Sequence, residues 1–430
     1  MGRAAFKAWL DHPSGAERGV TMDGVFVSWD TLAQTARERA GELAPGHSYV
    51  ADPSCGFDGI ASFLAIASTP DTNVLWAKAA DVPFPLSPVA AGLFACAESP
   101  KHSATRPFYS TLTSGTSGSP KIPVAYGDML ELIALHYYHA AYLPSFAGEP
   151  EVNVLATALP LQYAASFIMI LIPALFLKKD LLIFSPHRWD QLCAAASREF
   201  VVCLMVPSLI PAARAATPEL VHLPKAALIM ASGYLTPERL RTARETYGDV
   251  TLMNCYGASE TGIVSIDRDP GKGFHVGQPI FGKPVWLEDV NEDGVGRIAT
   301  SGVDCREFYW LQDETLKRQD GSVAATDFGH FDESGNLYLD GRLDGGEKLH
   351  GITVYPRQIE RHILDLQGVA DVAVRIRVVN GIDHLAVRVV GRVTEDQLRE
   401  HCSSLPEVDR PTLVECLPEG FEHYSSHGKL

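Results

Sequence analysis

The chain has 430 residues, of which 46% are hydrophobic and 20% charged, with a formal net charge of −16. This length and composition predict two or three domains with buried cores and exclude a disordered chain. The acidic balance excludes a general binder of nucleic acid or of anionic membrane surfaces, although a small anionic ligand such as a nucleotide stays compatible with it.

Cysteine usage and hydropathy point to a cytoplasmic protein. The eight cysteines contain no C-x-x-C pair, which favours reduced thiols over a disulfide framework or a zinc site. The first residues contain no apolar signal core. The most apolar segment, 164–177, is 14 residues long and contains Pro173. A membrane span needs about 20 residues, so this segment predicts a buried helix and no membrane span.

Strands and helices alternate in the middle of the chain. Continuous apolar runs are separated by helical patterns, which predicts an α/β fold with mostly parallel sheets covered on both faces. Ligands bind such sheets at the carboxyl ends of the strands. The expected strands are 152–160, 181–184, 201–206, 226–230 and 250–253, and the expected helices are 164–177, 189–199, 207–214 and 237–247.

The character of the chain changes after about residue 262. Short strands and Gly/Asp turns predict a small β-rich subdomain, and a Gly-rich break follows Arg342. We therefore expect a large domain over residues 1–342, a hinge at 343–344 and a small α+β C-terminal domain over 345–430.

A Ser/Gly-rich run follows a strand-like segment at 108–114. The stretch STLTSGTSGSPKIPVA (110–125) is compatible with a flexible linker or with a phosphate-binding loop, in which glycine amides, hydroxyls and a lysine contact oxygens. The spacing excludes a P-loop NTPase, because Pro120 precedes Lys121 and Ile122 follows it. It also excludes the G-x-S-x-G elbow of hydrolases. The kinase-like TDFG at 326–329 lacks a preceding H-R-D element.

Two histidines on a helical pattern, His136 and His139, have the spacing of metal ligands. No carboxylate trio accompanies them, so the sequence favours a partly buried helix over a metal site.

Several segments taken together resemble the acyl-adenylate-forming, AMP-binding superfamily of acyl-CoA synthetases, aryl-acid ligases and adenylation domains. TSGTSGSPK (113–121) resembles its phosphate loop, and NCYGASE (254–260) resembles its Tyr-Gly-x-Thr-Glu motif. The series from 325 to 360 and the terminal SSHGKL (425–430) follow in the family's order. Relative to the family, the N-terminal part of the large domain is shortened.

The resemblance implies ATP, Mg²⁺ and a role for each matching residue. Lys121 and the loop would hold the β- and γ-phosphates, Glu260 would hold Mg²⁺, and Lys429 would bridge the acid and ATP. Asp327 and Arg342 would bind the ribose, Tyr256 would stack near adenine, and Asp344 would be the hinge. The implied catalytic set is Lys429, Glu260, Thr116 and Lys121, and the nucleotide-binding set is Thr113, Ser114, Gly115, Thr116, Ser117, Gly118, Lys121, Gly233, Asn254, Tyr256, Gly257, Ser259, Asp327 and Arg342.

The resemblance also implies an acid pocket and an acyl acceptor. Bulky residues at its positions predict a small aromatic or short acid, and the acceptor is coenzyme A or the phosphopantetheine arm of a carrier protein. The implied pocket residues are Gln162, Tyr163, Ser232, Tyr234 and Ala258.

Alternatives remain at the level of the sequence. The acceptor could be an amine, or the fold could bind a nucleotide without catalysis. Lys429 lies next to the C-terminus, where a frayed tail is the structural alternative. Tyr256 could be a packing residue, and Asp344 and Glu360 could be solvated charges.

Overall fold

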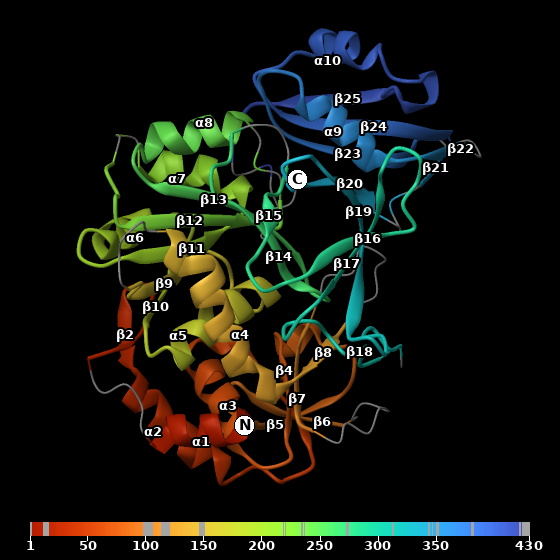
Figure 1. Cartoon of the computed structure of the whole chain (residues 1–430). Helices are drawn as coiled ribbons and strands as arrows, with labels where there is room; N and C mark the ends of the chain where they lie inside the picture. The colour runs from red at the N-terminus through yellow and green to blue at the C-terminus, as the bar shows by residue number, and fades with distance from the viewer. Residues whose placement is uncertain are drawn as a thin grey trace.

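The computed structural model describes most of the chain (Figure 1). The described residues are 2–11, 17–97, 106–112, 121–145, 151–217, 219, 221–233, 235, 237–271, 275–311, 314–342, 345, 347–349, 352–379, 382–420 and 423.

The largest sheet is the predicted α/β core. Nine strands of the described residues form it, and its inner pairs from β13 to β1 are parallel. Antiparallel strands flank it on both edges. The spatial order is β15 (Gln278–Pro279), β14 (Gly262–Asp267), β13 (Thr251–Ala258), β12 (Ala226–Ala231), β11 (Val201–Met205), β9 (Val154–Thr157), β10 (Asp180–Ile183), β1 (Gly19–Met22) and β2 (Val25–Ser28).

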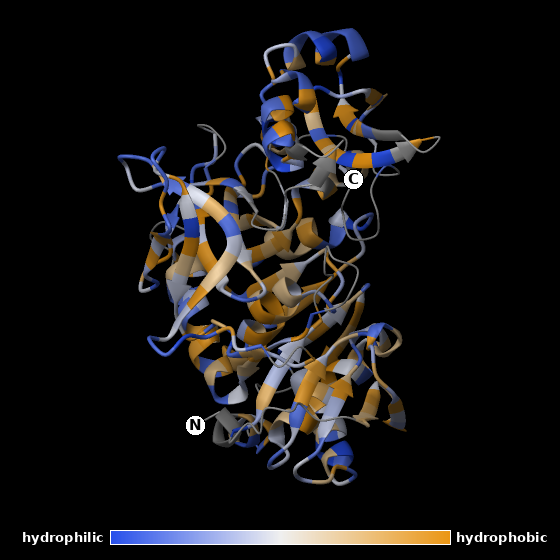
Figure 2. Ribbon diagram, turned by 90° about the vertical axis from the view of Figure 1, so that its right-hand side faces the viewer, coloured by the Kyte–Doolittle hydropathy of each residue, from blue (hydrophilic) through white to orange (hydrophobic). Residues whose placement is uncertain are grey.

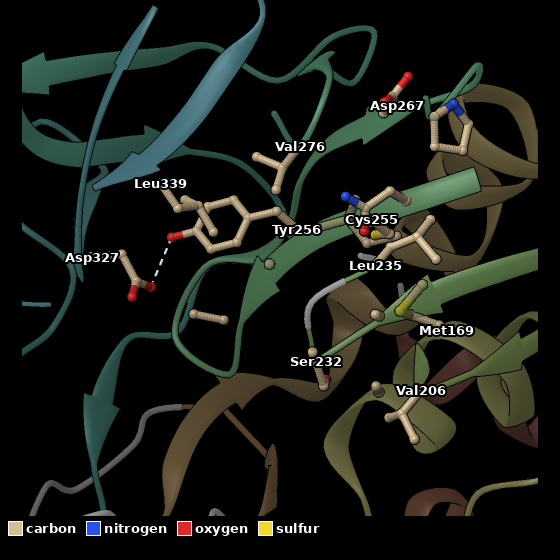
Figure 3. Close-up of a pocket in the computed structure, with 18 of the residues that line it drawn as sticks. Met169, Val206, Ser232, Leu235, Cys255, Tyr256, Asp267, Val276, Asp327 and Leu339 are labelled. Atoms are coloured by element: carbon tan, nitrogen blue, oxygen red, sulfur yellow. Dashed lines mark hydrogen bonds between the residues drawn. The ribbon is translucent and has the colours of Figure 1, made fainter. Parts of the chain in front are cut away.

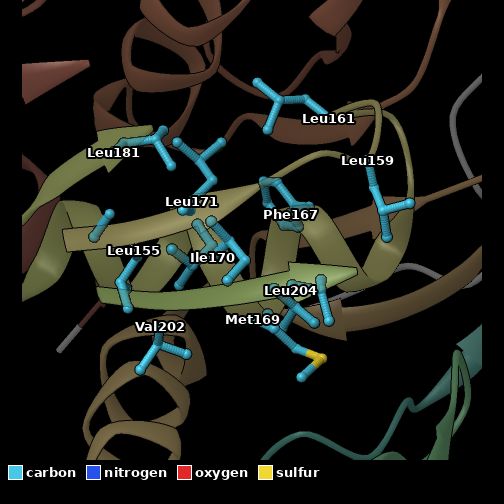
Figure 4. Packing of buried hydrophobic residues seen from close by; sticks show 14 of the residues in the cluster. Leu155, Leu159, Leu161, Phe167, Met169, Ile170, Leu171, Leu181, Val202 and Leu204 are labelled. Atoms are coloured by element: carbon cyan, nitrogen blue, oxygen red, sulfur yellow. The ribbon is translucent and has the colours of Figure 1, made fainter. Parts of the chain in front are cut away.

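The inner strands of this sheet are buried on both faces, as their unbroken apolar runs predict. All residues of β9, β11 and β12 are buried. Figure 4 shows Leu155 of β9, Val202 and Leu204 of β11, and Phe167 and Leu171 as members of one cluster of buried side chains. Burying one such side chain stabilises the fold by about 1.5–3 kcal/mol, so this layer fixes the sheet that carries the cavity.

The predicted apolar helix lies within this core. Residues Ser166–Leu171 form a π-helical segment, η6, and Ile172–Phe176 form α5; all of η6 is buried. No described helix is long and apolar enough to cross a membrane. The other predicted helices are confirmed as α6 (Trp189–Ala196), η7 (Pro207–Leu209) with α7 (Ile210–Ala216), and α8 (Pro237–Thr246).

His136 and His139 lie on helix, as expected. His136 is half-buried on α4 (Leu130–Tyr137), and His139 is exposed on the π-helical η4 (Tyr138–Tyr142). Within the described ranges, no group of three or more potential ligands from His, Cys, Asp and Glu gathers around one point. All eight cysteines are free thiols.

A second sheet is built from the N-terminal part of the chain. Helix α3 (Phe57–Ser68) packs on β3 and β4, and α1 (Gly2–Asp11) and α2 (Trp29–Ala40) pack on α3. The side chain of Ser28 caps α2 by accepting from the Thr31 amide. In the part that the structure describes, seven strands have the order β18 (Phe308–Tyr309), β8 (Pro123–Tyr126), β7 (Phe108–Thr111), β4 (Asn73–Trp76), β3 (Ser48–Ala51), β6 (Leu93–Cys96) and β5 (Leu86–Ala90).

The β-rich subdomain predicted after residue 262 is an antiparallel sheet. Its order is β16 (Val285–Glu288), β17 (Gly296–Ser301), β19 (Ser322–Phe331) and β20 (Leu337–Arg342). Short 3₁₀ turns complete the large region: η1 (Pro53–Cys55), η2 (Ala79–Asp81), η3 (Gly127–Met129) and η5 (Leu143–Ser145).

The C-terminal segment has a core of its own, as an α+β unit requires. Apolar side chains of α9 pack on the strands β23 and β24, and Leu398 and Cys402 of α10 join the cluster. In Figure 2 the outermost helix of this segment, α10, is mostly hydrophilic, whereas its strands carry both hydrophilic and hydrophobic residues. The domain boundary at 343–344 stays a prediction. The elements are β21 (Glu347–Leu349), β22 (Ile352–Val354), α9 (Pro356–Leu364), β23 (Val369–Val379), β24 (Ile382–Gly391), α10 (Glu395–Cys402), η8 (Glu407–Asp409) and β25 (Leu413–Leu417).

The C-terminal segment lies against α8 and β20 of the large region (Figure 1). Arg239 of α8 and Asp371 of β23 form a buried ion pair of 2.6 Å. Arg361 of α9 contacts Asp340 of β20 at 2.5 Å. These pairs hold α9 beside the sheet that ends at Arg342.

Glu360 on α9 is buried, so the alternative that it is a solvated charge is wrong. Its side chain accepts a hydrogen bond of 3.0 Å from the Val374 amide and lies 3.2 Å from the Arg357 guanidinium. Burial raises the pKa of Glu360 above its usual value, against the lowering effects of Arg357 and the Val374 amide.

We expect Glu360→Gln to make stability less dependent on pH. A carboxyl with a raised pKa in the folded state favours folding when protonated, and that contribution is lost as pH rises from 4.5 through the raised pKa. The glutamine variant should therefore gain on the wild type in this window, measured by urea unfolding at several pH values. Glu395→Gln, at an exposed pair on α10, should not change the pH profile. A variant whose stability falls with rising pH as steeply as that of the wild type would contradict the expectation.

Candidate functional site

A cavity of about 900 Å³ lies between the central sheet, the β-rich sheet and α9 (Figure 3). Strand β13 contributes consecutive residues at its carboxyl end, where ligands bind open α/β sheets. Helices α8 and α9 contribute arginines, and η6 contributes apolar side chains. The sequence-predicted residues that line the cavity are Lys121, Tyr163, Ser232, Gly233, Asn254, Tyr256, Gly257, Ala258, Ser259, Glu260 and Asp327.

Tyr256 and Asp327 face each other at one end of the cavity. The Tyr256 hydroxyl donates to Asp327 Oδ2 at 2.9 Å, drawn as the dashed line in Figure 3. Asp327 is opposite Arg342 in the register of β19 and β20, which brings the two predicted ribose-binding residues to one place on the sheet. Tyr256 is 7% exposed and packs in a small core cluster, yet its hydroxyl has a polar partner at the cavity. It is therefore both a packing residue and a lining residue.

Glu260 and Lys121 lie around the ring of Tyr309. The Tyr309 hydroxyl donates to Glu260 Oε1 at 2.7 Å, and Lys121 Nζ lies 5.2 Å from the centroid of the same ring. The two charged groups come from segments 139 positions apart in the sequence, 121 and 260. A carboxylate and a cation beside one cavity can hold a metal ion and an anionic oxygen.

The turn after β12 has constrained backbone geometry. Ser232 has a φ of 61°, the left-handed region that a non-glycine residue seldom adopts. A Cβ on the neighbouring Gly233 would approach Pro207 Cδ to 3.3 Å. Nearby, the Asn254 amide donates to the His275 carbonyl at 3.4 Å. These contacts shape the wall where the adenine ring is predicted to lie.

Some of the predicted site residues are not described by the structure, and one described residue does not line the cavity. Thr113, Ser114, Gly115, Thr116, Ser117, Gly118, Tyr234, Asp344 and Lys429 lie outside the described residues, as does the side chain of Arg342. Gln162 is described, but only its neighbour Tyr163 lines the cavity.

The other half of the cavity is mostly apolar. Met169 and Val206 are drawn in Figure 3 far from Asp327, beyond Ser232. Burial raises the pKa of Tyr163 to about 12, with a smaller contribution from Asp81, so its hydroxyl stays neutral at physiological pH. This half offers mainly apolar contacts to a bound molecule.

Sequence patterns gave no signal for several polar residues of the site. Arg306 and Tyr309 lie in the segment GVDCREFYW (302–310), which matches no motif considered above, and their contacts are formed only by the fold. Asp267 and His275 also line the cavity, 3.3 Å apart. Burial raises the pKa of Asp267, against the lowering effect of a backbone amide and of His275.

A protein-family model described as AMP-binding enzyme matches residues 58–310. Among curated proteins, an indoleacetate–CoA ligase of Aromatoleum aromaticum is 26% identical over 285 residues, covering 61% of this chain and 52% of that protein. A 2-succinylbenzoate–CoA ligase of Arabidopsis thaliana is 25% identical over 174 residues, which is 34% of this chain and 31% of that protein. The chain thus spans about a third to a half of the length of these relatives.

The same fold occurs in solved structures. The anthranilate CoA ligase AuaEII in complex with anthranoyl-AMP has a TM-score of 0.71 and 16% identity, covering all of this chain and 95% of that one. The amide bond synthetase McbA of Marinactinospora thermotolerans has a TM-score of 0.70 and 20% identity, covering 97% and 96%. Likeness at this identity is a likeness of fold.

Proposed function

Because the chain belongs to the AMP-binding enzymes of the acyl-adenylate-forming superfamily, we propose that it activates a small carboxylic acid with ATP to give an acyl-adenylate and pyrophosphate. The observation that carries the proposal is the convergence of Lys121, Glu260, Tyr256 and Asp327 on one cavity. These residues come from three separate stretches of the chain, and each matches a position with a role in nucleotide activation.

The proposed reaction is attack of a carboxylate oxygen on the α-phosphorus of ATP. A bond forms between that oxygen and phosphorus, and the bond from phosphorus to the β-phosphate oxygen breaks, so pyrophosphate leaves. Such transfer depends on positioning and on cations aimed at developing charge. Asp327 and Arg342 would hold the ribose, Ser259 would contact the α-phosphate, and Lys121 would neutralise the leaving phosphates. Lys429 would bridge the acid and ATP.

The carboxylate of Glu260 fits a magnesium ion. Mg²⁺ in nucleotide sites is held by one or two carboxylates together with substrate phosphates. Glu260 is a carboxylate at the cavity wall, and Tyr309 orients one of its oxygens. When bound, the ion neutralises charge on the phosphates of ATP.

A thiol is the acceptor that we propose for the second step, either coenzyme A or the phosphopantetheine arm of a carrier protein. The names of relatives support it: a CoA ligase for indoleacetate and a 3,4-dihydroxybenzoate–[aryl-carrier protein] ligase of Bacillus anthracis. An amine is the second candidate, since the amide bond synthetase McbA has the same fold. A non-catalytic nucleotide-binding protein is the remaining alternative.

The experiment that tests the proposal is carboxylate-dependent exchange between ATP and pyrophosphate with Mg²⁺. The panel contains benzoates, cinnamates, short and long fatty acids, dicarboxylic acids and amino acids. Exchange with one class establishes adenylation and gives the substrate class; coenzyme A, a holo carrier protein and amines are then compared as acceptors. ATP binding without exchange for any acid would favour the non-catalytic alternative. Better turnover of long fatty acids than of benzoates would contradict a small acid.

Replacing Asp327 by alanine should raise the KM for ATP at least about tenfold, because hydrogen bonds to a charged group contribute about 1.5–3 kcal/mol. Tyr256→Phe keeps the ring and removes the 2.9 Å hydrogen bond, so it should change the KM for ATP by about threefold or less. Both values come from the exchange assay at saturating acid. Equal effects of the two variants would contradict direct ribose binding by Asp327.

A further inference from the structure

Arg306 is a cation deep in the wall of the cavity. It is 1% exposed and lines the cavity, and its backbone amide donates to the Glu260 carbonyl at 2.8 Å. Its guanidinium carbon lies 4.8 Å from the centroid of the Tyr109 ring, and one nitrogen donates to the Tyr109 hydroxyl. Its Nε has no hydrogen-bond acceptor among the described residues.

Asp304 and Glu307, the carboxylates nearest to Arg306 in the sequence, each form an ion pair with a lysine. Lys283 and Asp304, each 1% exposed at the side chain, form an ion pair of 2.6 Å. The second oxygen of Asp304 accepts from the Tyr137 hydroxyl at 2.7 Å. The Asp304 carboxylate is therefore occupied by two other partners, and in the described ranges no carboxylate forms an ion pair with Arg306.

A buried guanidinium without a carboxylate is costly, because burial removes its hydration. A fold maintains such a group where a ligand supplies the missing anion. The cavity provides the access for that ligand, and a guanidinium suits a carboxylate because its planar donors match the two oxygens.

The contacts of the guanidinium connect it with the helix that lines the apolar half of the cavity. Its partner Tyr109 packs against Phe167 of η6, with ring centroids 5.9 Å apart. Two residues that follow Phe167 on η6, Ile168 and Met169, line the apolar half. Lys121 and Glu260, by contrast, meet around Tyr309 on the side assigned to the phosphates.

Building on the proposed function, we propose that Arg306 binds a second carboxylate of the acid, so that the activated substrate is a small dicarboxylic acid. The carboxylate that reacts with ATP lies toward Ser259 and Glu260, and the second one pairs with the guanidinium beside Tyr109. Arg306 is in this sense the specificity-determining residue of the cavity.

The test compares Arg306→Met and Arg306→Lys with the wild type on matched acids: benzoate with benzene-1,3-dicarboxylate, and butanoate with butanedioate. We expect the wild type to favour one dicarboxylate over its matched acid at least about tenfold in kcat/KM for exchange. R306M should lose about 10- to 100-fold on that dicarboxylate and stay within about threefold on the matched acid and in the KM for ATP. R306K, which keeps the charge, should recover part of the preference.

The control is Arg268→Met, which removes a guanidinium that donates to the carbonyls of Ala140 and Ala141 and does not line the cavity. It should lower the melting temperature without changing the ratio between the acids. A higher KM for ATP in R306M with every acid would assign the arginine to the phosphates, and a changed melting temperature with an unchanged ratio would make it structural. Either result overturns the proposal, as does a wild type without preference, which decides the matter even if R306M does not fold.

Failure of the proposed function is recognised separately. If no acid supports exchange, adenylation is wrong. Thermal stabilisation of the wild type by the dicarboxylate alone, absent in R306M and present in R268M, would still support the arginine site, whereas equal stabilisation of the three proteins would overturn it.

Discussion

Replacing Glu260 by glutamine should lower the rate of ATP–pyrophosphate exchange by about 100- to 1,000-fold, the usual loss when a group aimed at developing charge is removed. The substitution keeps the size of the side chain and can keep an acceptor for the Tyr309 hydroxyl, which is 2.7 Å from Oε1. It removes only the charge that would hold Mg²⁺. The variant should therefore fold as the wild type does and need more Mg²⁺ for half-maximal exchange.

Tyr309→Phe is the matched control for this prediction. It keeps the Glu260 carboxylate but removes the hydroxyl that orients it, and loss of such an orienting partner typically weakens metal affinity by about 10- to 100-fold. Saturating Mg²⁺ should restore most of the exchange in Y309F and much less in E260Q. If E260Q exchanges at the wild-type rate, Glu260 is not the metal ligand and the assignment of the phosphate side of the cavity is wrong.

Elements with strong local patterns could be predicted from the sequence. Runs such as VVCLM at Val201–Met205 are apolar on both faces and so predict buried parallel strands, which the sheet confirms. The π-helical geometry of Ser166–Leu171 could not be predicted, because an apolar segment has the same composition in either helix type. The acid pocket shows the same limit: Gln162 and Tyr163 are adjacent, and only the orientation of the chain decides which one reaches the cavity.

Residues that line the cavity could be predicted where they belong to a compact motif. Tyr256 and Glu260 stand in one short segment, and Asp327 in another, so their order along the chain identifies them. Arg306 could not be predicted, since its burial and its contact with Tyr109 arise from segments 197 positions apart. A buried cation has no local sequence signature, because the residue type is the same whether the arginine is exposed or buried.

Docking of the C-terminal segment depends on a contact of the same long-range kind. Arg239 and Asp371 are 132 positions apart, and their side chains are 3% and 12% exposed. Replacing Asp371 by alanine removes the carboxylate 2.6 Å from the guanidinium. Breaking a buried pair at one partner costs about 3–5 kcal/mol.

The C-terminal segment can avoid part of that cost by separating from α8, because separation would return Arg239 to water. We therefore expect Asp371→Ala to favour an undocked arrangement as well as to lower stability. Limited proteolysis of the stretch between β20 and β21 should become faster, and the radius of gyration from small-angle scattering should increase. The Arg361–Asp340 contact, which is partly exposed, should not compensate, because such pairs contribute about 0–1 kcal/mol.

The double variant Arg239→Met, Asp371→Met distinguishes the effect of an unpaired charge from the effect of lost packing. Replacing both members of a buried pair by apolar side chains is often neutral or stabilising, whereas removing one leaves the other without its partner. The double variant should thus be more stable than D371A by at least about 2 kcal/mol and should restore slow proteolysis. A D371A protein that unfolds within about 1 kcal/mol of the wild type, with unchanged proteolysis, would contradict a docking role for the pair.

If the two steps of the proposed reaction require the C-terminal segment in different positions, the charged pair has a consequence that the apolar pair lacks. Water can rehydrate the two charges when the segment leaves, so the ion pair allows separation at a lower cost than an apolar contact of equal buried area. The methionine double variant should then exchange pyrophosphate normally but transfer the acyl group to its acceptor more slowly.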